Sequence, residues 1–172
     1  MKTLVLGGMR SGKSRFAEAL AHRSPKPVTV IATALAGDDE MRLRIAAHHA
    51  ARPADWPVIE APHRLAEALF DADRQRGTIV VECLTLWLAQ LLERAETDAL
   101  ALEYTALLDV LPRLTSEVVL VSNETGLGVV PHGELSRRFL DTAGRLHQEL
   151  AERCECVVFM VAGLPTVLKG AL

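Results

Sequence analysis

The chain has 172 residues, of which 49% are hydrophobic and only 4% aromatic, so we expect a core built mainly from Ala, Leu and Val. Its length predicts a single nucleotide-binding catalytic domain over residues 1–172. Lys plus Arg number 19 against 22 Asp plus Glu, a net charge of −3, which argues against a nucleic-acid binder with a broad basic surface. The apolar runs are short and broken by charges and no cationic leader precedes them, so we expect no membrane span and a cytoplasmic location.

The first motif lies between a predicted strand at residues 3–6 and a predicted helix at residues 15–20, and it follows the pattern Gly-x-x-x-x-Gly-Lys-Ser. It consists of Gly7, Gly8, Met9, Arg10, Ser11, Gly12, Lys13 and Ser14. In such a phosphate-binding loop (P-loop), backbone N–H groups converge on a polyphosphate at the start of a helix. We predict that Lys13 binds the β- and γ-phosphates of GTP or ATP and that the Ser14 hydroxyl binds Mg²⁺.

After this motif, short buried strands alternate with helical patterns along the chain. Strands are predicted at residues 28–33, 78–83, 118–123 and 156–161, an extended segment at 56–60 and an edge strand at 167–169. Helices are predicted at 38–52, 64–76, 84–93, 98–114 and 135–154. This order indicates an α/β fold without an internal repeat.

The predicted helix at 38–52 carries Arg44, His48 and Arg52 at intervals of four residues, which places them on one face. Two guanidinium groups on either side of an imidazole favour binding of an anion. They also disfavour the imidazolium, so His48 is expected to be neutral and nucleophilic. His49 aligns instead with Ile45. The alternative is that both histidines belong to an ordinary solvated helix surface.

Several polar residues lie where predicted strands end. Glu82 ends the strand at 78–83, where P-loop proteins carry an acid facing Mg²⁺, usually Asp. Because ligands bind beyond the carboxyl ends of strands in open α/β sheets, Thr33, Glu82 and Asn123 are expected to face one crevice. The longest irregular segment follows at residues 124–134, and it is either a functional lid or an ordinary surface loop.

These features leave three functional classes open. The first is a small-molecule kinase. The second is an enzyme that also transfers a nucleotidyl group through a covalent histidine intermediate. The third, a non-catalytic nucleotide switch, is weakened because the sequence lacks the guanine-reading Asn-Lys-x-Asp pattern.

Nearly the whole chain resembles the bifunctional adenosylcobinamide kinase and adenosylcobinamide-phosphate guanylyltransferase family of cobalamin biosynthesis. The resemblance rests on a set of motifs that occur in a fixed order. They are Gly7-Gly8-x-Arg10-Ser11-Gly12-Lys13-Ser14, Ala32-Thr33, Asp39-Glu40-Met41, Arg44-Ile45-x-x-His48-x-x-x-Arg52-Pro53, Glu82-Cys83, Asn123-Glu124-x-Gly126-x-Gly128-x-Val130-Pro131 and Asp141-x-x-Gly144-Arg145. One departure is His147-Gln148, where the family usually has Asn followed by Gln.

The resemblance implies a three-layer P-loop NTPase fold with a RecA-like, mostly parallel sheet flanked by helices, and assembly as a homotrimer. It implies phosphorylation of adenosylcobinamide, a corrinoid, followed by GMP transfer from GTP to adenosylcobinamide phosphate, with release of pyrophosphate. His48 aligns with the family's GMP-histidine position. The implied nucleotide contacts, besides the P-loop, are Ala32, Thr33, Ala34, His49, Ala50, Ala51, Arg52, Glu60 and Glu82.

Overall fold

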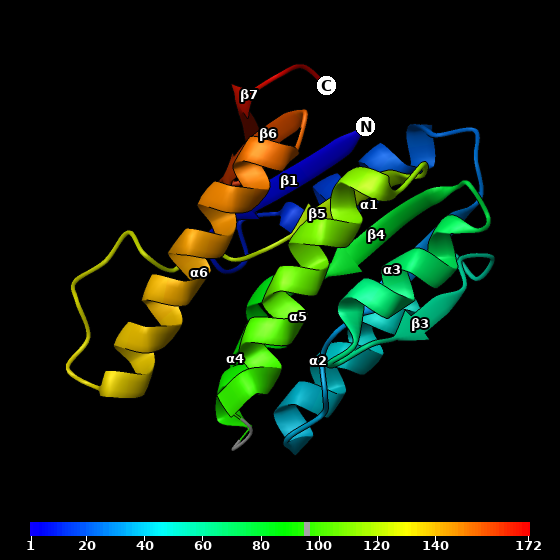
Figure 1. Ribbon diagram of the computed structural model, residues 1–172. Helices are drawn as coiled ribbons and strands as arrows, with labels where there is room; N and C mark the ends of the chain where they lie inside the picture. The colour runs from blue at the N-terminus through cyan, green and yellow to red at the C-terminus, as the bar shows by residue number, and fades with distance from the viewer. Residues whose placement is uncertain (95–96) are drawn as a thin grey trace.

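A computed structural model describes residues 1–94 and 97–172, except for the side chains of Met41, Arg44, His48, His49, Ala51 and Thr97. Strands and helices alternate through most of the chain (Figure 1). In chain order the elements are β1 (Lys2–Gly7), α1 (Lys13–Arg23), β2 (Val28–Ala32), α2 (Asp39–Ala51), β3 (Val58–Glu60), α3 (Leu65–Asp73), β4 (Thr78–Glu82), α4 (Leu84–Glu93), α5 (Thr97–Val110), the 3-10 helix η1 (Leu111–Arg113), β5 (Glu117–Val121), α6 (Glu134–Arg153), β6 (Cys156–Val161) and β7 (Leu164–Lys169).

The described strands form one sheet of seven strands in the order β3-β2-β4-β5-β1-β6-β7. All neighbouring pairs are parallel except β6 and β7, which form an antiparallel hairpin. The carboxyl ends of the parallel strands therefore lie at one edge of the sheet. Because β5 lies between β1 and β4, the ends of β1 and β4 are about 10 Å apart across that edge.

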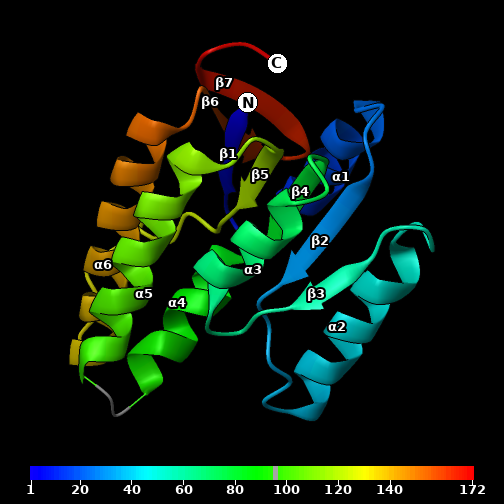
Figure 2. The ribbon, with the colours of Figure 1, turned by 45° about the vertical axis from the view of Figure 1, so that its right-hand side comes forward.

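Helices cover both faces of the sheet, which gives the three predicted layers. Figures 1 and 2 show α3, α5 and α6 side by side on one face, with α1 on the other and α2 beside β3 at the edge. The strands alternate accordingly: Leu4 and Leu6 point into the core beneath α3–α6, whereas Val5 points toward α1. This period of two, in strands buried on both faces, explains their unbroken apolar runs.

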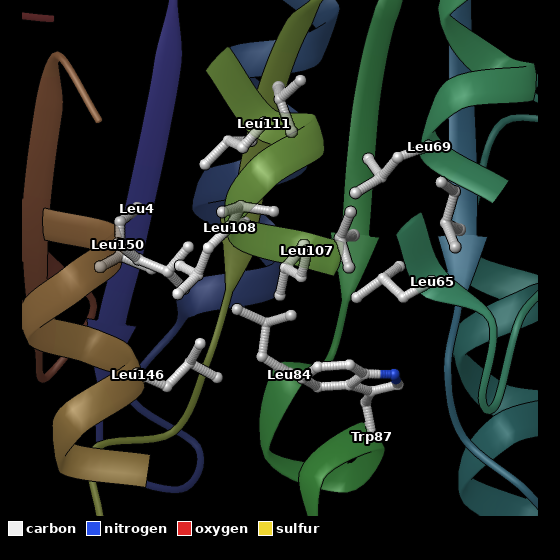
Figure 3. Close-up of a cluster of buried hydrophobic side chains, with 14 of the residues drawn as sticks. Leu4, Leu65, Leu69, Leu84, Trp87, Leu107, Leu108, Leu111, Leu146 and Leu150 are labelled. Carbon is white, nitrogen blue, oxygen red and sulfur yellow. The ribbon is translucent and has the colours of Figure 1, made fainter. Parts of the chain in front are cut away.

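The larger core lies between the sheet and helices α3–α6, and leucine dominates it (Figure 3). Leu107 of α5 and Leu146 of α6 pack there, and Figure 3 shows Leu84 and Trp87 of α4 beside Leu65 and Leu107. Trp87 is fully buried, and its indole N–H donates to the carbonyl oxygen of His63 at 2.9 Å. A core of leucines with few aromatics matches the prediction from composition.

Several predicted boundaries differ from the observed ones by one to four residues, and two of these differences have a clear physical reason. The helix predicted at 98–114 ends at Val110 and continues as η1, because Pro112 has no N–H for an α-helical hydrogen bond. The edge strand predicted at 167–169 begins at Leu164. It follows a two-residue turn in which Ala162 and Gly163 have φ angles of 51° and 81°. That geometry suits a tight hairpin, but alanine seldom adopts it, so only Gly163 signalled the turn.

Among the helices that the structure describes, none combines the length and the apolar character needed to cross a membrane.

Truncating Leu107 tests the larger core. Leu107→Ala should lower the free energy of unfolding by about 2–5 kcal/mol, because the side chain is fully buried between α5 and the sheet. Leu102→Ala is the matched control on the same helix, since Leu102 is 69% exposed and its loss should change stability by less than about 0.5 kcal/mol. Equal effects of the two substitutions in urea denaturation would contradict this packing.

Candidate active site

The P-loop connects β1 to α1 and turns sharply where it approaches β6 and β7. A Cβ atom on Gly7 would lie 2.5 Å from the carbonyl oxygen of Met160, and one on Gly12 would lie 3.1 Å from Cα of Gly163. Gly12 has a φ of 95° and precedes the first turn of α1, whose N–H groups have no helical partner. These N–H groups and the helix dipole form an anion site, as the motif predicts.

Lys13 lies in the first turn of α1 and crosses the loop. Its ammonium group donates to the carbonyl oxygen of Gly8 at 2.7 Å. Burial lowers the pKa of Lys13, and the electrostatic interaction with the nearby Cys83 side chain opposes this shift. A partly desolvated ammonium group gains strongly from an anion placed beside it, so Lys13 suits binding of a phosphate.

Thr33 joins the ends of β2 and β4. It is completely buried, and its hydroxyl oxygen accepts the Cys83 N–H at 2.8 Å and lies 2.9 Å from the carbonyl oxygens of Glu82 and Cys83. Gln90 of α4 donates to the Thr33 carbonyl oxygen at 2.8 Å. The prediction that Thr33 faces the crevice with Glu82 and Asn123 is therefore wrong for its side chain, which fixes the strand that carries Glu82.

Glu82 ends β4 and forms an ion pair with Arg52, which follows α2. Both side chains are largely buried, with 12% and 5% of their surfaces exposed. Nε and Nη1 of Arg52 are also buried, and neither has a hydrogen-bond partner in the part of the chain that the structure describes. Buried N–H donors without partners are costly, so this guanidinium group is poised to bind a further anion.

A cavity of about 970 Å³ brings these elements together at the carboxyl edge of the sheet. Its lining includes the predicted residues Met9, Arg10, Ser11, Gly12, Lys13, Ser14, Ala32, Ala34, Arg52, Glu60, Glu82 and Asn123. Gly7, Gly8 and Ala50 are not part of the lining. The side chains of Arg44, His48, His49 and Ala51 lie outside the described residues, so their predicted roles remain predictions.

The cavity also has walls that sequence reasoning missed. These are Arg15, Ile45, Ala47, Cys83, Leu86, Val121, Ala162 and Gly163. Most are apolar, and an apolar wall carries no chemical signature in a sequence. Gly163 is the exception, because a glycine between two strand patterns indicates a tight turn.

The donor set at the cavity fits a magnesium ion. Ser14 and Glu82 offer a hydroxyl and a carboxylate oxygen on the same cavity. Mg²⁺ is usually held by one or two protein oxygens together with substrate phosphates, so a dedicated cage of protein ligands is not required. Among the described residues, no group of three or more His, Cys, Asp or Glu residues gathers as a metal site.

Comparison with known proteins decides the family. Residues 3–168 match the family described as "Cobinamide kinase / cobinamide phosphate guanyltransferase". The chain belongs to this family. The bifunctional adenosylcobalamin biosynthesis protein CobP of Pseudomonas aeruginosa is 56% identical over 170 residues, which cover 99% of this chain and 98% of the relative. CobU of Escherichia coli, with the same description, is 37% identical over 98% of this chain and 100% of the relative. The predicted class, a bifunctional kinase and guanylyltransferase, is confirmed.

Solved structures support the fold. The chain is similar to the RadB recombinase, with a TM-score of 0.52 and 16% identity over 92% of this chain and 73% of that one. It is also similar to an ATPase of a bacterial type III secretion system, with a TM-score of 0.58 and 9% identity over 96% and 56% of the two chains. The predicted RecA-like P-loop NTPase fold is confirmed.

Lys13→Ala tests the anion site. The substitution should lower nucleotide-dependent turnover by about three orders of magnitude or more, because charge neutralisation and positioning dominate phosphoryl transfer. Lys26→Ala is the control, since Lys26 forms only an exposed ion pair with Glu117 and should not matter to turnover. Steady-state kinetics distinguish the two variants. Normal turnover of Lys13→Ala would show that the loop binds no reacting phosphate.

Glu82→Gln tests the carboxylate at the end of β4. The amide keeps the shape and can still accept from Arg52, but it loses the charge, so kcat should fall by about 10²-fold while the protein stays folded. Glu117→Gln removes an exposed carboxylate at the start of β5 and should leave kcat unchanged. If the folded fraction of Glu82→Gln turns over at the wild-type rate, Glu82 is structural.

Proposed function

We propose that this protein phosphorylates adenosylcobinamide with a nucleoside triphosphate and then transfers GMP from GTP to the phosphate it has made. The observation that supports this most directly is the cavity that the P-loop, Glu82 and Arg52 line together. One nucleotide site would then serve two transfers at different phosphorus atoms. Family membership is consistent with both activities.

In the kinase step, the hydroxyl of the corrinoid side arm would attack the γ-phosphorus, and the bond to the β-phosphate would break. Lys13 and the first-turn N–H groups of α1 would hold the β- and γ-phosphates. Glu82 would lie beside the attacking hydroxyl or the metal. Mg²⁺ bound through Ser14 would neutralise charge on the phosphates.

In the guanylyltransferase step, we assign His48 as the nucleophile. Its imidazole nitrogen would attack the α-phosphorus of GTP, forming a P–N bond while pyrophosphate leaves. The phosphate of the corrinoid would then attack the same phosphorus, breaking the P–N bond and freeing the imidazole. The partnerless nitrogens of Arg52, on the segment that follows α2, would stabilise charge on the α-phosphate oxygens.

The remaining nucleotide contacts are proposed from the resemblance. They comprise Ala32 and Ala34, residues His49 to Ala51, and Glu60, of which Ala32, Ala34 and Glu60 line the cavity. Thr33, which lies between Ala32 and Ala34, is fully buried and acts through its hydrogen bonds to the backbone of Glu82 and Cys83. The resemblance also leads us to propose a homotrimer. A cytoplasmic location is proposed because both nucleoside triphosphates are supplied there.

Covalent labelling separates the bifunctional enzyme from a plain kinase. With GTP labelled at the α-phosphate, the wild type should acquire a GMP adduct that is labile to acid and stable to base, as expected of a P–N bond. His48→Ala should lose the adduct and the guanylyltransferase step but keep much of the kinase step. His49→Ala is the neighbouring variant for comparison. Because His49 is itself a proposed nucleotide contact, the variant is labelled at saturating GTP, where it should keep the adduct. A folded, GTP-binding wild type without label, or a label on His49, would overturn the assignment.

A further inference from the structure

A buried histidine that the reaction scheme leaves unused lies behind the cavity. His147 of α6 is 6% exposed, and its Nε2 lies 2.8 Å from the hydroxyl oxygen of Ser122, the residue after β5. Its Nδ1 lies 3.6 Å from a carboxylate oxygen of Glu124. The Ser122 hydroxyl also forms a hydrogen bond with the Thr85 hydroxyl of α4, with 3.2 Å between the two oxygens. We call these four residues, with Asn123, the His147 network.

A serine, a histidine and a glutamate in this order resemble a hydrolytic triad, but burial argues against that role. Ser122 is 1% exposed, so no substrate carbonyl can approach its oxygen. The hydroxyl is also engaged on two sides, by His147 and by Thr85. The arrangement therefore holds structure in place instead of attacking a substrate.

One fixed donor sets a consistent direction for the hydrogen bonds of the network. The backbone N–H of Asn123 donates to the Thr85 hydroxyl oxygen at 2.7 Å. If Thr85 then donates to Ser122, and Ser122 to His147, each hydroxyl donates once and accepts once. Nε2 of His147 is then an acceptor and Nδ1, which carries the proton, faces the Glu124 carboxylate 3.6 Å away as a charge contact without a hydrogen bond. Burial lowers the pKa of His147, while Glu124 opposes the shift, and this favours the neutral ring that the pattern requires.

The network ends at atoms of the active site. Asn123 lines the cavity, and because it follows β5 it lies between the P-loop and Glu82. The backbone N–H of Glu124 donates to the carbonyl oxygen of Gly7 at 2.9 Å, and the Glu124 carboxylate accepts from Gly126 N–H at 2.6 Å. The same short segment thus contacts the first P-loop glycine and begins the irregular stretch before α6, which extends away from the sheet in Figure 1.

We propose that His147, as the Nδ1–H tautomer, is a positioning residue for the group-transfer reactions: through Ser122 and Thr85 it fixes Asn123 between the P-loop and Glu82. The proposal rests on the proposed function for its kinetic consequences, but not for its structural ones. Nucleotide binding depends mainly on the P-loop, whereas the acceptor reacts in the space that Asn123 borders. Losing the network should therefore affect kcat more than the KM for nucleotide.

The structural part of the proposal is tested by measurements that require no enzymatic turnover. In the wild type with ¹⁵N-labelled histidine, the imidazole NMR signals of His147 should show a protonated Nδ1 and an unprotonated Nε2. His147→Leu should also speed hydrogen exchange at the backbone amide of Asn123. This amide donates to the Thr85 hydroxyl, which is held in place through Ser122 by His147. The opposite tautomer, or unchanged exchange at Asn123, would overturn the proposal even if the enzyme proved inactive with corrinoids.

The kinetic part uses variants that keep or remove single contacts. His147→Leu should lower kcat of both transfers by about 10–100-fold, because small misplacements at a reacting centre are costly, and should leave the nucleotide KM within about threefold. His147→Gln places an amide where Nε2 lies and should recover kcat to within about threefold of the wild type. Ser122→Ala removes the hydrogen bond to His147, and with it the contact to Thr85, with little loss of volume, and it serves if His147→Leu fails to fold.

Tyr104→Phe is the matched control, because Tyr104 donates to Glu149 of α6 at 3.1 Å, a contact that does not involve the network. It should leave kcat unchanged. The double variant His147→Leu/Ser122→Ala should be no slower than the slower single variant. Each single substitution already breaks the hydrogen bond between His147 and Ser122, so the second substitution has no further effect through that bond. Fully additive losses, failure of Gln to rescue, or a normal kcat in folded His147→Leu would each overturn the proposal.

Discussion

The close contact between the P-loop and the hairpin of β6 and β7 is the constraint on which the site depends. Glycine is favoured at positions 7 and 12 for two reasons. A Cβ atom on Gly7 would collide with the backbone of β6, and Gly12 combines a φ of 95° with a tight approach to the turn at Gly163. The Gly163 N–H also donates to the Ser11 carbonyl oxygen at 3.0 Å. These contacts hold the start of α1 against the sheet. The strand order then determines where the anion site of α1 lies relative to the ends of the other strands.

Because the start of α1 is fixed in this way, the position of β5 between β1 and β4 determines the space available for substrates. The strand separates the ends of β1 and β4 by about 10 Å, which leaves room for a phosphate chain and an acceptor hydroxyl between the P-loop and Glu82. Arg52 enters this space from the segment after α2 and pairs with Glu82. A buried ion pair adds little net stability, because desolvation offsets most of the attraction. The pair instead holds the Glu82 carboxylate and the Arg52 guanidinium group at one cavity. Nε and Nη1 of Arg52 stay available there to donate to an anion.

The sequence was most informative where chemistry and geometry coincide. The P-loop pattern, with the strand and helix around it, predicted the anion site, and the acid at the end of a buried strand predicted Glu82 at the cavity. Thr33 was misjudged because a threonine after a strand has the same signal whether its hydroxyl faces a ligand or the neighbouring backbone. The His147 network joins residues from α4, β5 and α6 that lie up to 62 positions apart (85 to 147), and no local pattern encodes such contacts. In the sequence, His147 is recognisable only as a histidine where the family usually has asparagine.

The central claim is that one cavity serves both reactions, and inhibition by GDP tests it most directly. GDP lacks the γ-phosphoryl group and should occupy the P-loop without reacting. Its inhibition constant, measured competitively against GTP in the kinase assay and in the guanylyltransferase assay on the same sample, should agree within about twofold, because both constants would describe one equilibrium. Constants that differ by more than about tenfold, or inhibition of only one reaction, would mean two separate nucleotide sites.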